Sequence, residues 1–143
     1  MTARAEKTIT GKQVLRIIDA NLNRLREALR VIEEYYRFAS ADKRLAASLK
    51  RMRHSLEGVE AVFGAQALLA SRDVASDPFA NVNRPEELTR TSGRDVLRAN
   101  FKRGQEAARV IEEFAKVSTA PALSEKAKAL RFSLYTLEME FSE

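Results

Sequence analysis

Cysteine is absent from this chain of 143 residues, so disulfide bonds, thiolate zinc sites and cysteine nucleophiles are excluded. No apolar run approaches the roughly 20 residues that a membrane-spanning helix needs. The segment MTARAEKTITGK lacks the apolar core of a secretory signal. We therefore expect a cytoplasmic protein that is neither inserted into a membrane nor exported.

Glycine and proline are scarce as well, with 5 and 3 copies, and the stretches between them place apolar residues three and four positions apart. That spacing is typical of amphipathic helices. We predict helices over residues 14–39, 42–71, 94–117 and 124–141, with Asp42 as the N-cap of the second. Residues 72–93 lack this periodicity and predict a loop with one helical turn at Pro85 to Leu88. A loop of this length is usually functional or disordered.

Positive charge is in excess, since 25 Lys and Arg against 20 Asp and Glu give a net charge of +5. The excess favours phosphate-bearing partners. The charges are interspersed, without the basic tract of a dedicated nucleic-acid binder, so that function is the weakest alternative. The chain also has no phosphate-binding glycine loop, no protein-kinase signature and no HExxH metal motif. A bound nucleotide would require an unfamiliar helical surface.

The sequence repeats itself. The segment from Val96 aligns with the segment from Ile17 at an offset of 79, with ten identities in 22 positions. Residues 130–134 align with residues 52–56 at an offset of 78, so the repeated unit is a pair of helices. We predict an all-α fold with one domain over residues 1–143, in which repeats at 14–71 and 94–141 form an antiparallel four-helix bundle.

Polar residues repeat at positions where an apolar arc is expected. Asparagine and arginine fall in or beside the arc, and a glutamate one turn later can reach the arginine. Burying such groups costs free energy unless they are paired. They either form an internal network that fixes the register of the hairpins or converge on a cavity that binds anions. The six residues are Asn21, Arg24, Glu27, Asn100, Arg103 and Glu106.

Other polar residues allow two interpretations each. Arg53 repeats as Arg131, and both side chains either lie against the core or extend to solvent. His54 is the only histidine and is structural or functional. Arg72, Asp73 and Asp77 are ordinary turn residues and caps, or the carboxylates of Asp73 and Asp77 hold a magnesium ion that bridges phosphates.

Several segments carry a family resemblance over residues 16–138. RIIDANLNRLREALRVIEEYYRF, LKRMRHSLE, LLASRD, LRANFKRGQEAARVIEEFAK and LRFSLYTLE resemble the helical domain at the N-terminus of some bacterial thiamine phosphate synthases, which also occurs as a separate protein. The resemblance implies a monofunctional hydroxymethylpyrimidine phosphate kinase of the thiamine pathway that uses ATP and magnesium. Its partners would be the pyrimidine phosphate, the nucleotide and, functionally, thiamine phosphate synthase. Whether the bundle forms a homodimer stays open.

The resemblance also suggests roles for residues. Arg24 and Arg103 would clamp phosphates, and Asn21 and Asn100 would orient them or the pyrimidine. Glu27, Glu106 or Asp73 would hold magnesium, and further charge would come from Arg53, His54 and Arg72. A non-enzymatic helical module for ligand or protein binding in the same pathway is the alternative.

Overall fold

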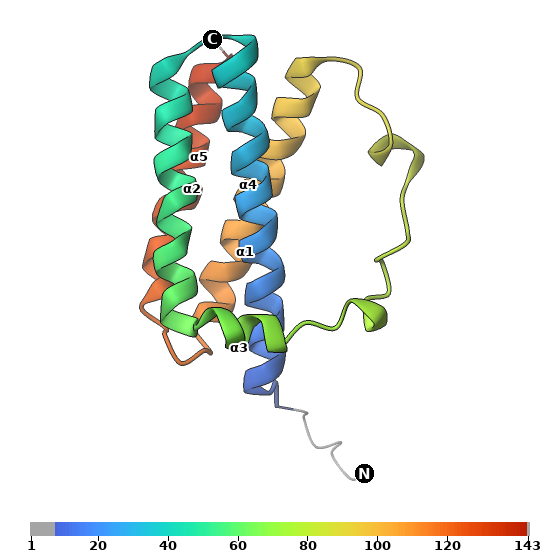
Figure 1. The fold of residues 1–143 in the computed structure, drawn as a ribbon, viewed down its shortest axis with the longest axis vertical. Helices are drawn as coiled ribbons and strands as arrows, with labels where there is room; N and C mark the ends of the chain where they lie inside the picture. The colour runs from blue at the N-terminus through green and yellow to red at the C-terminus, as the bar shows by residue number, and fades with distance from the viewer. Residues whose placement is uncertain (1–7, 143) are drawn as a thin grey trace, which may run out of the picture.

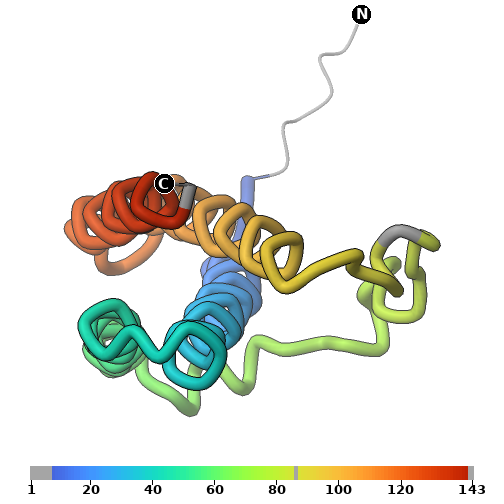
Figure 2. The backbone as a smooth tube through the Cα atoms, turned by 90° about the horizontal axis from the view of Figure 1, so that it is seen from above, coloured from blue at the N-terminus to red at the C-terminus, as the bar shows by residue number. Residues whose placement is uncertain are grey.

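The computed structural model describes residues 8–142 as an all-helical protein, which confirms the predicted fold class. Four long helices run along one another: α1 (Gly11–Glu34), α2 (Lys43–Phe63), α4 (Gly93–Ala115) and α5 (Leu123–Ser142) (Figure 1). Seen from above, α1 and α4 lie together, and each carries its hairpin partner beside it (Figure 2). No strand occurs within the described range, and none of its helices is long and apolar enough to cross a bilayer.

Local sequence fixes where the long helices begin. Thr10 caps α1 through a reciprocal pair of hydrogen bonds with Gln13, so the helix starts three residues earlier than predicted. Asp42 caps α2 as predicted, because its carboxylate accepts a hydrogen bond from the Leu45 amide at 3.1 Å. Ser92 caps α4 in the same way.

Two helix ends differ from the prediction. The second predicted helix is broken at Gly64, whose φ of 87° lies in the left-handed region, and a short α3 (Ala65–Ala70) follows. The first helix ends in a π-helical segment, η1 (Tyr35–Ala39). The long connection contains two short 3₁₀ turns, η2 (Val74–Ser76) and η3 (Pro85–Glu87), and η3 confirms the turn predicted there.

The core is centred where α1 crosses α4. Residues with no exposed surface at this crossing include Leu25, Leu29, Leu97 and Phe101, and Leu134 of α5 packs against them. Gly104 allows the close approach, because a Cβ atom there would lie 3.0 Å from Leu134 Cδ1 and 3.6 Å from Ala28 Cβ. Ala28 and Gly104 therefore mark the centre of the pseudo-symmetric pair.

Replacing Gly104 with leucine should destabilise the protein by about 1–3 kcal/mol, because the added side chain must displace Leu134 or separate α1 from α4. Urea unfolding followed by circular dichroism measures the change. Gly58→Leu on α2 is the matched control, since among the described residues a Cβ there would meet just the end of the Lys126 side chain. Equal stability of the two variants would contradict the proposed close approach.

Tyr36 provides a second test of the packing. The side chain is buried, and its hydroxyl has no hydrogen-bond partner among the described residues. Burial raises the pKa of Tyr36 above its usual value of 10.0. Tyr36→Phe should therefore leave the free energy of unfolding unchanged or raise it by about 1 kcal/mol at neutral pH.

The sign of the pH dependence follows from the same pKa. The neutral phenol is favoured in the folded state, so this contribution to stability is complete below pH 10.0 and declines as the pH rises further. Unfolding curves of the wild type and Tyr36→Phe at neutral and alkaline pH should show a smaller alkaline loss in the variant. An identical loss would mean that Tyr36 does not titrate as a buried group.

Candidate functional site

The duplicated asparagines make the same local contact in both repeats. Asn21 Nδ2 donates to the Ile17 carbonyl oxygen at 2.9 Å, and Asn100 Nδ2 donates to the Val96 carbonyl oxygen at 2.8 Å. Each amide is therefore bound within its own helix, four residues back. Asn21 is buried and Asn100 is half-buried.

The two asparagines do not converge. Because α1 and α4 run antiparallel with Ala28 opposite Gly104, Asn21 lies beside Val110 in a groove that Asn100 does not line. Val110 and Asn100 are ten residues apart on α4, which is roughly 15 Å along the helix. The predicted cavity shared by both asparagines and both arginines is therefore wrong.

The arginines and glutamates of the repeats are exposed, contrary to the prediction that the arginines lie within the apolar arc. Arg24 Nη1 donates to Asn21 Oδ1 at 3.4 Å. Glu27 approaches Arg103 of the other repeat, at 3.8 Å, and not the predicted Arg24. Glu106 lines a separate hollow on the side of α4. The structure thus brings together Asn21 with Arg24 and Glu27 with Arg103.

A groove of about 730 Å³ is lined by Asn21 and Arg24 of the first repeat. Arg16, Asn21 and Arg24 of α1 form its polar side. Val110 and Phe114 of α4 form an apolar wall, and residues 76–78 of the long loop close one end. The carboxylate in the lining is Asp77, which accepts a hydrogen bond from the Phe79 amide at 2.9 Å. An arginine pair beside an aromatic wall is suited to a phosphorylated ring compound.

The beginning of the loop is fixed to α1. Arg72 forms two hydrogen bonds with the buried carboxylate of Asp19, at 2.6 and 3.1 Å. Arg16 donates to the main-chain oxygen of Asp73 at 2.7 Å and to Ser76 Oγ at 3.2 Å. Arg72 was predicted to bind phosphate, and the structure places it in this ion pair, where it positions the loop.

The carboxylate of Asp73 forms a hydrogen bond within its own turn. It accepts this hydrogen bond from the Ser76 amide at 3.2 Å, and hydrogen bonding by Ser76 lowers the pKa of Asp73. Asp19, Asp73 and Asp77 line one adjoining hollow, yet no group of three potential metal ligands forms within residues 8–142. The magnesium role of Asp73 stays a prediction.

A duplicated ion pair connects the two helices of each hairpin. Arg53 on α2 binds Glu33 on α1 at 2.9 and 3.3 Å, and Arg131 on α5 binds Glu112 on α4 at 3.0 and 3.1 Å. Both carboxylates are buried. Arg53 was predicted to bind phosphate, and the structure gives it this hairpin contact. Glu33 and Glu112 were missed, although their identity in both repeats was the signal that could have found them.

His54 is exposed on α2, outside the groove that contains Asn21 and Arg24. Phe132, its counterpart on α5, is 52% exposed. Neither packs in the core, so this pair of positions differs between the repeats without disturbing the bundle.

Known proteins match the sequence of this chain over nearly its whole length. The model of the ThiD2 family matches residues 16–140. A thiamine-phosphate synthase of Thermosynechococcus vestitus is 46% identical over 128 residues, which are 90% of this chain and 35% of the relative. Thiamine-phosphate synthases of Gloeobacter violaceus and Nostoc punctiforme are 45% and 41% identical, over 87% and 94% of this chain and 35% and 37% of the relatives. The search of solved structures gives no match.

The comparisons correct the predicted activity. The resemblance implied a monofunctional, ATP-dependent phosphomethylpyrimidine kinase, whereas the curated relatives carry the name thiamine-phosphate synthase, a different activity. Nothing in these matches indicates a kinase. The chain spans about a third of the length of these relatives. The predicted likeness to the helical region of thiamine phosphate synthases is confirmed.

Removing one partner of the ion pair between Arg53 and Glu33 should lower the stability of the protein. Arg53→Ala leaves the Glu33 carboxylate buried without its partner and should lower the free energy of unfolding by roughly 3 kcal/mol. Arg30→Ala is the control, because its pair with Glu34 is exposed and contributes less than about 1 kcal/mol. Chemical denaturation measures both. A loss at Arg53 no larger than at Arg30 would show that the pair does not hold the hairpin.

Proposed function

Since the chain belongs to the ThiD2 family, we propose that it serves thiamine biosynthesis by binding a phosphorylated pathway compound, a pyrimidine phosphate, in the groove between α1 and α4. Binding is the proposed role of this helical region, without phosphoryl transfer. The observation that supports it is the combination of two arginines and an aromatic wall in one groove.

The charges of the groove support an anionic ligand. Arg16 and Arg24 have hydrogen-bond partners that are neutral, namely the Asp73 main-chain oxygen, Ser76 and Asn21. Arg26, Arg53 and Arg72, which lie outside this groove, instead pair with carboxylates. Guanidinium groups whose direct hydrogen-bond partners are neutral can bind phosphate through charge-assisted hydrogen bonds.

The shape of the groove supports a small aromatic compound. Its volume of about 730 Å³ lies within the range of roughly 300–1,000 Å³ that small-molecule sites occupy. Phe114 and Val110 offer an apolar surface to a pyrimidine ring, opposite the arginines. Asn21 is held by Ile17, and its oxygen faces Arg24, so the amide keeps that guanidinium in place.

The partner proposed for this module is a thiamine-phosphate synthase. Relatives with that name contain the region matched by this chain as about a third of their length. A module that holds a phosphorylated compound beside such an enzyme would raise its local concentration. ATP with magnesium stays a second candidate ligand of the groove.

The binding test uses hydroxymethylpyrimidine phosphate. At a ligand concentration of about a hundred times the dissociation constant, the folded state should gain roughly 2.7 kcal/mol, seen as a rise in melting temperature. Arg24→Ala should weaken binding about tenfold or more in calorimetric titrations, because it removes a charged hydrogen-bond donor.

Arg103→Ala is the matched control, since Arg103 is the counterpart of Arg24 in the second repeat and pairs with Glu27 outside the groove. The Arg103→Ala variant should bind hydroxymethylpyrimidine phosphate with the affinity of the wild type. Parallel titrations with ATP and magnesium and with inorganic phosphate separate recognition of the ring from recognition of phosphate. Equal losses in both arginine variants, or no binding by the wild type, would overturn the proposal.

A further inference from the structure

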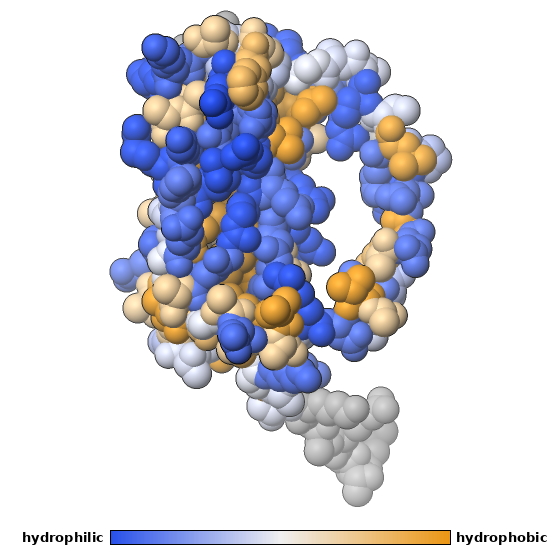
Figure 3. Space-filling model, in the orientation of Figure 1, coloured by the Kyte–Doolittle hydropathy of each residue, from blue (hydrophilic) through white to orange (hydrophobic). Residues whose placement is uncertain are grey.

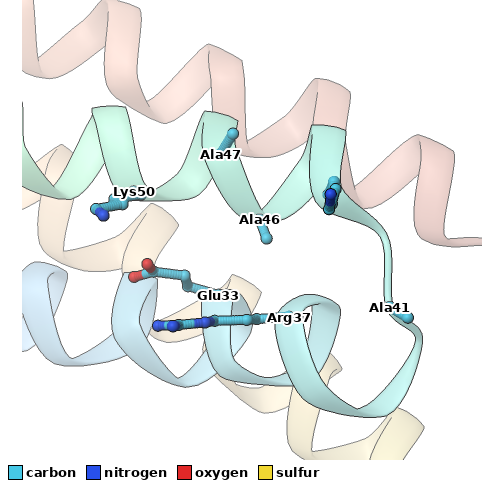
Figure 4. Close-up of a pocket in the computed structure, with 7 residues that line it drawn as sticks. Glu33, Arg37, Ala41, Ala46, Ala47 and Lys50 are labelled. Carbon is cyan, nitrogen blue, oxygen red and sulfur yellow. The ribbon is translucent and has the colours of Figure 1, made fainter.

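The tip of the first hairpin contains a second hollow, of about 410 Å³, formed where η1 turns into α2. Figure 4 shows Glu33 and Arg37 on one side and Ala46, Ala47 and Lys50 on the other. The ends of Arg37 and Lys50 point toward the same end of the hollow. Lys43 and Ala41 complete the lining.

The cations of this hollow have no carboxylate partners. Within residues 8–142 the structure gives no ion pair to Arg37, Lys43 or Lys50. Arg37 instead lies over the ring of Phe38, at 4.8 Å from the ring centroid. The Glu33 carboxylate is already bound by Arg53, so it does not neutralise the three cations.

The backbone is unusual at the same place. A π-helical segment, Tyr35–Ala39, precedes the turn, and Ala41 has a φ of 52°, in the left-handed region that L-residues rarely occupy. The Asp42 amide reaches back to the Tyr36 carbonyl oxygen at 2.7 Å. Single π-helical turns are frequent at functional sites, and strained residues cluster there.

The second repeat serves as an internal comparison. Its hairpin contains one residue fewer, as the offsets of 79 and 78 show, and α4 ends without a π-helical segment. Lys116, the counterpart of Arg37, pairs with Glu113 at 2.9 Å. Among the described residues, the extra residue of the first hairpin thus occurs together with an unpaired Arg37, whereas the corresponding Lys116 of the shorter hairpin is paired.

From these observations we infer that the hollow lined by Arg37, Lys43 and Lys50 is a second anion site, which binds the phosphate or diphosphate group of a small molecule. The site is separate from the groove between α1 and α4, since the residues that line the two differ. Three cations around alanines leave room for such a group and favour one with more than a single negative charge.

The test titrates inorganic diphosphate into the full ¹⁵N-labelled chain at constant ionic strength and follows amide shifts. Shifts at Ala41, Ala46 and Ala47 should saturate, and the double variant Arg37→Ala with Lys50→Ala should weaken this binding about tenfold or more. Lys116→Ala is the matched control and should bind as the wild type does. Circular dichroism checks that each variant remains folded.

A further variant separates this site from the groove. Arg24→Ala should leave the diphosphate-induced shifts at Ala41 and Ala46 unchanged, even where binding in the groove is lost. No saturable shift at the hairpin tip, or an equal loss of affinity in the Lys116→Ala control, would overturn the inference. Inorganic phosphate, titrated alongside, should bind more weakly than diphosphate because it carries less charge.

Discussion

The close contact of α1 with α4 is the constraint on which the rest of the structure depends. Gly104 lets the two helices approach at Ala28, and the leucines on either side are fully buried there. Helices that approach at small residues bury more of their apolar surface. Because this contact sets the centre of the pseudo-symmetry, it also decides which side chains meet and which face separate grooves.

Helical periodicity predicted the elements well, since the apolar spacing and the Asp42 cap are local properties of the chain. The repeat predicted a pair of helices as the unit, because both helices of the pair align at nearly the same offset. Convergence of Asn21 with Asn100 failed because sequence identity does not give distance from the symmetry axis. Where two helices cross antiparallel, side chains of the two repeats meet near the centre of the crossing, as Glu27 and Arg103 do. The asparagines lie toward opposite ends of the crossing.

The contacts shared by the repeats are structural, and the features that differ are those suited to ligands. Both hairpins have the buried Arg–Glu pair, which fixes the distance between their helices. Within residues 8–142, the docked loop over a groove and the π-helical turn that carries Arg37 belong to the first repeat. Function could not be assigned from the duplicated residues alone, because Asn21 and Arg24 line a groove that their counterparts Asn100 and Arg103 do not line.

The long loop leaves the bundle after its docked beginning and forms an open arch, with apolar residues exposed along it (Figure 3). Arg16 holds its first turn through the main-chain oxygen of Asp73, an atom that every amino acid provides at that position. Side chains further along the arch can therefore vary during evolution while its base stays attached. The attachment of the loop to α1 and the side chains of the arch beyond it are therefore two independent features of the fold.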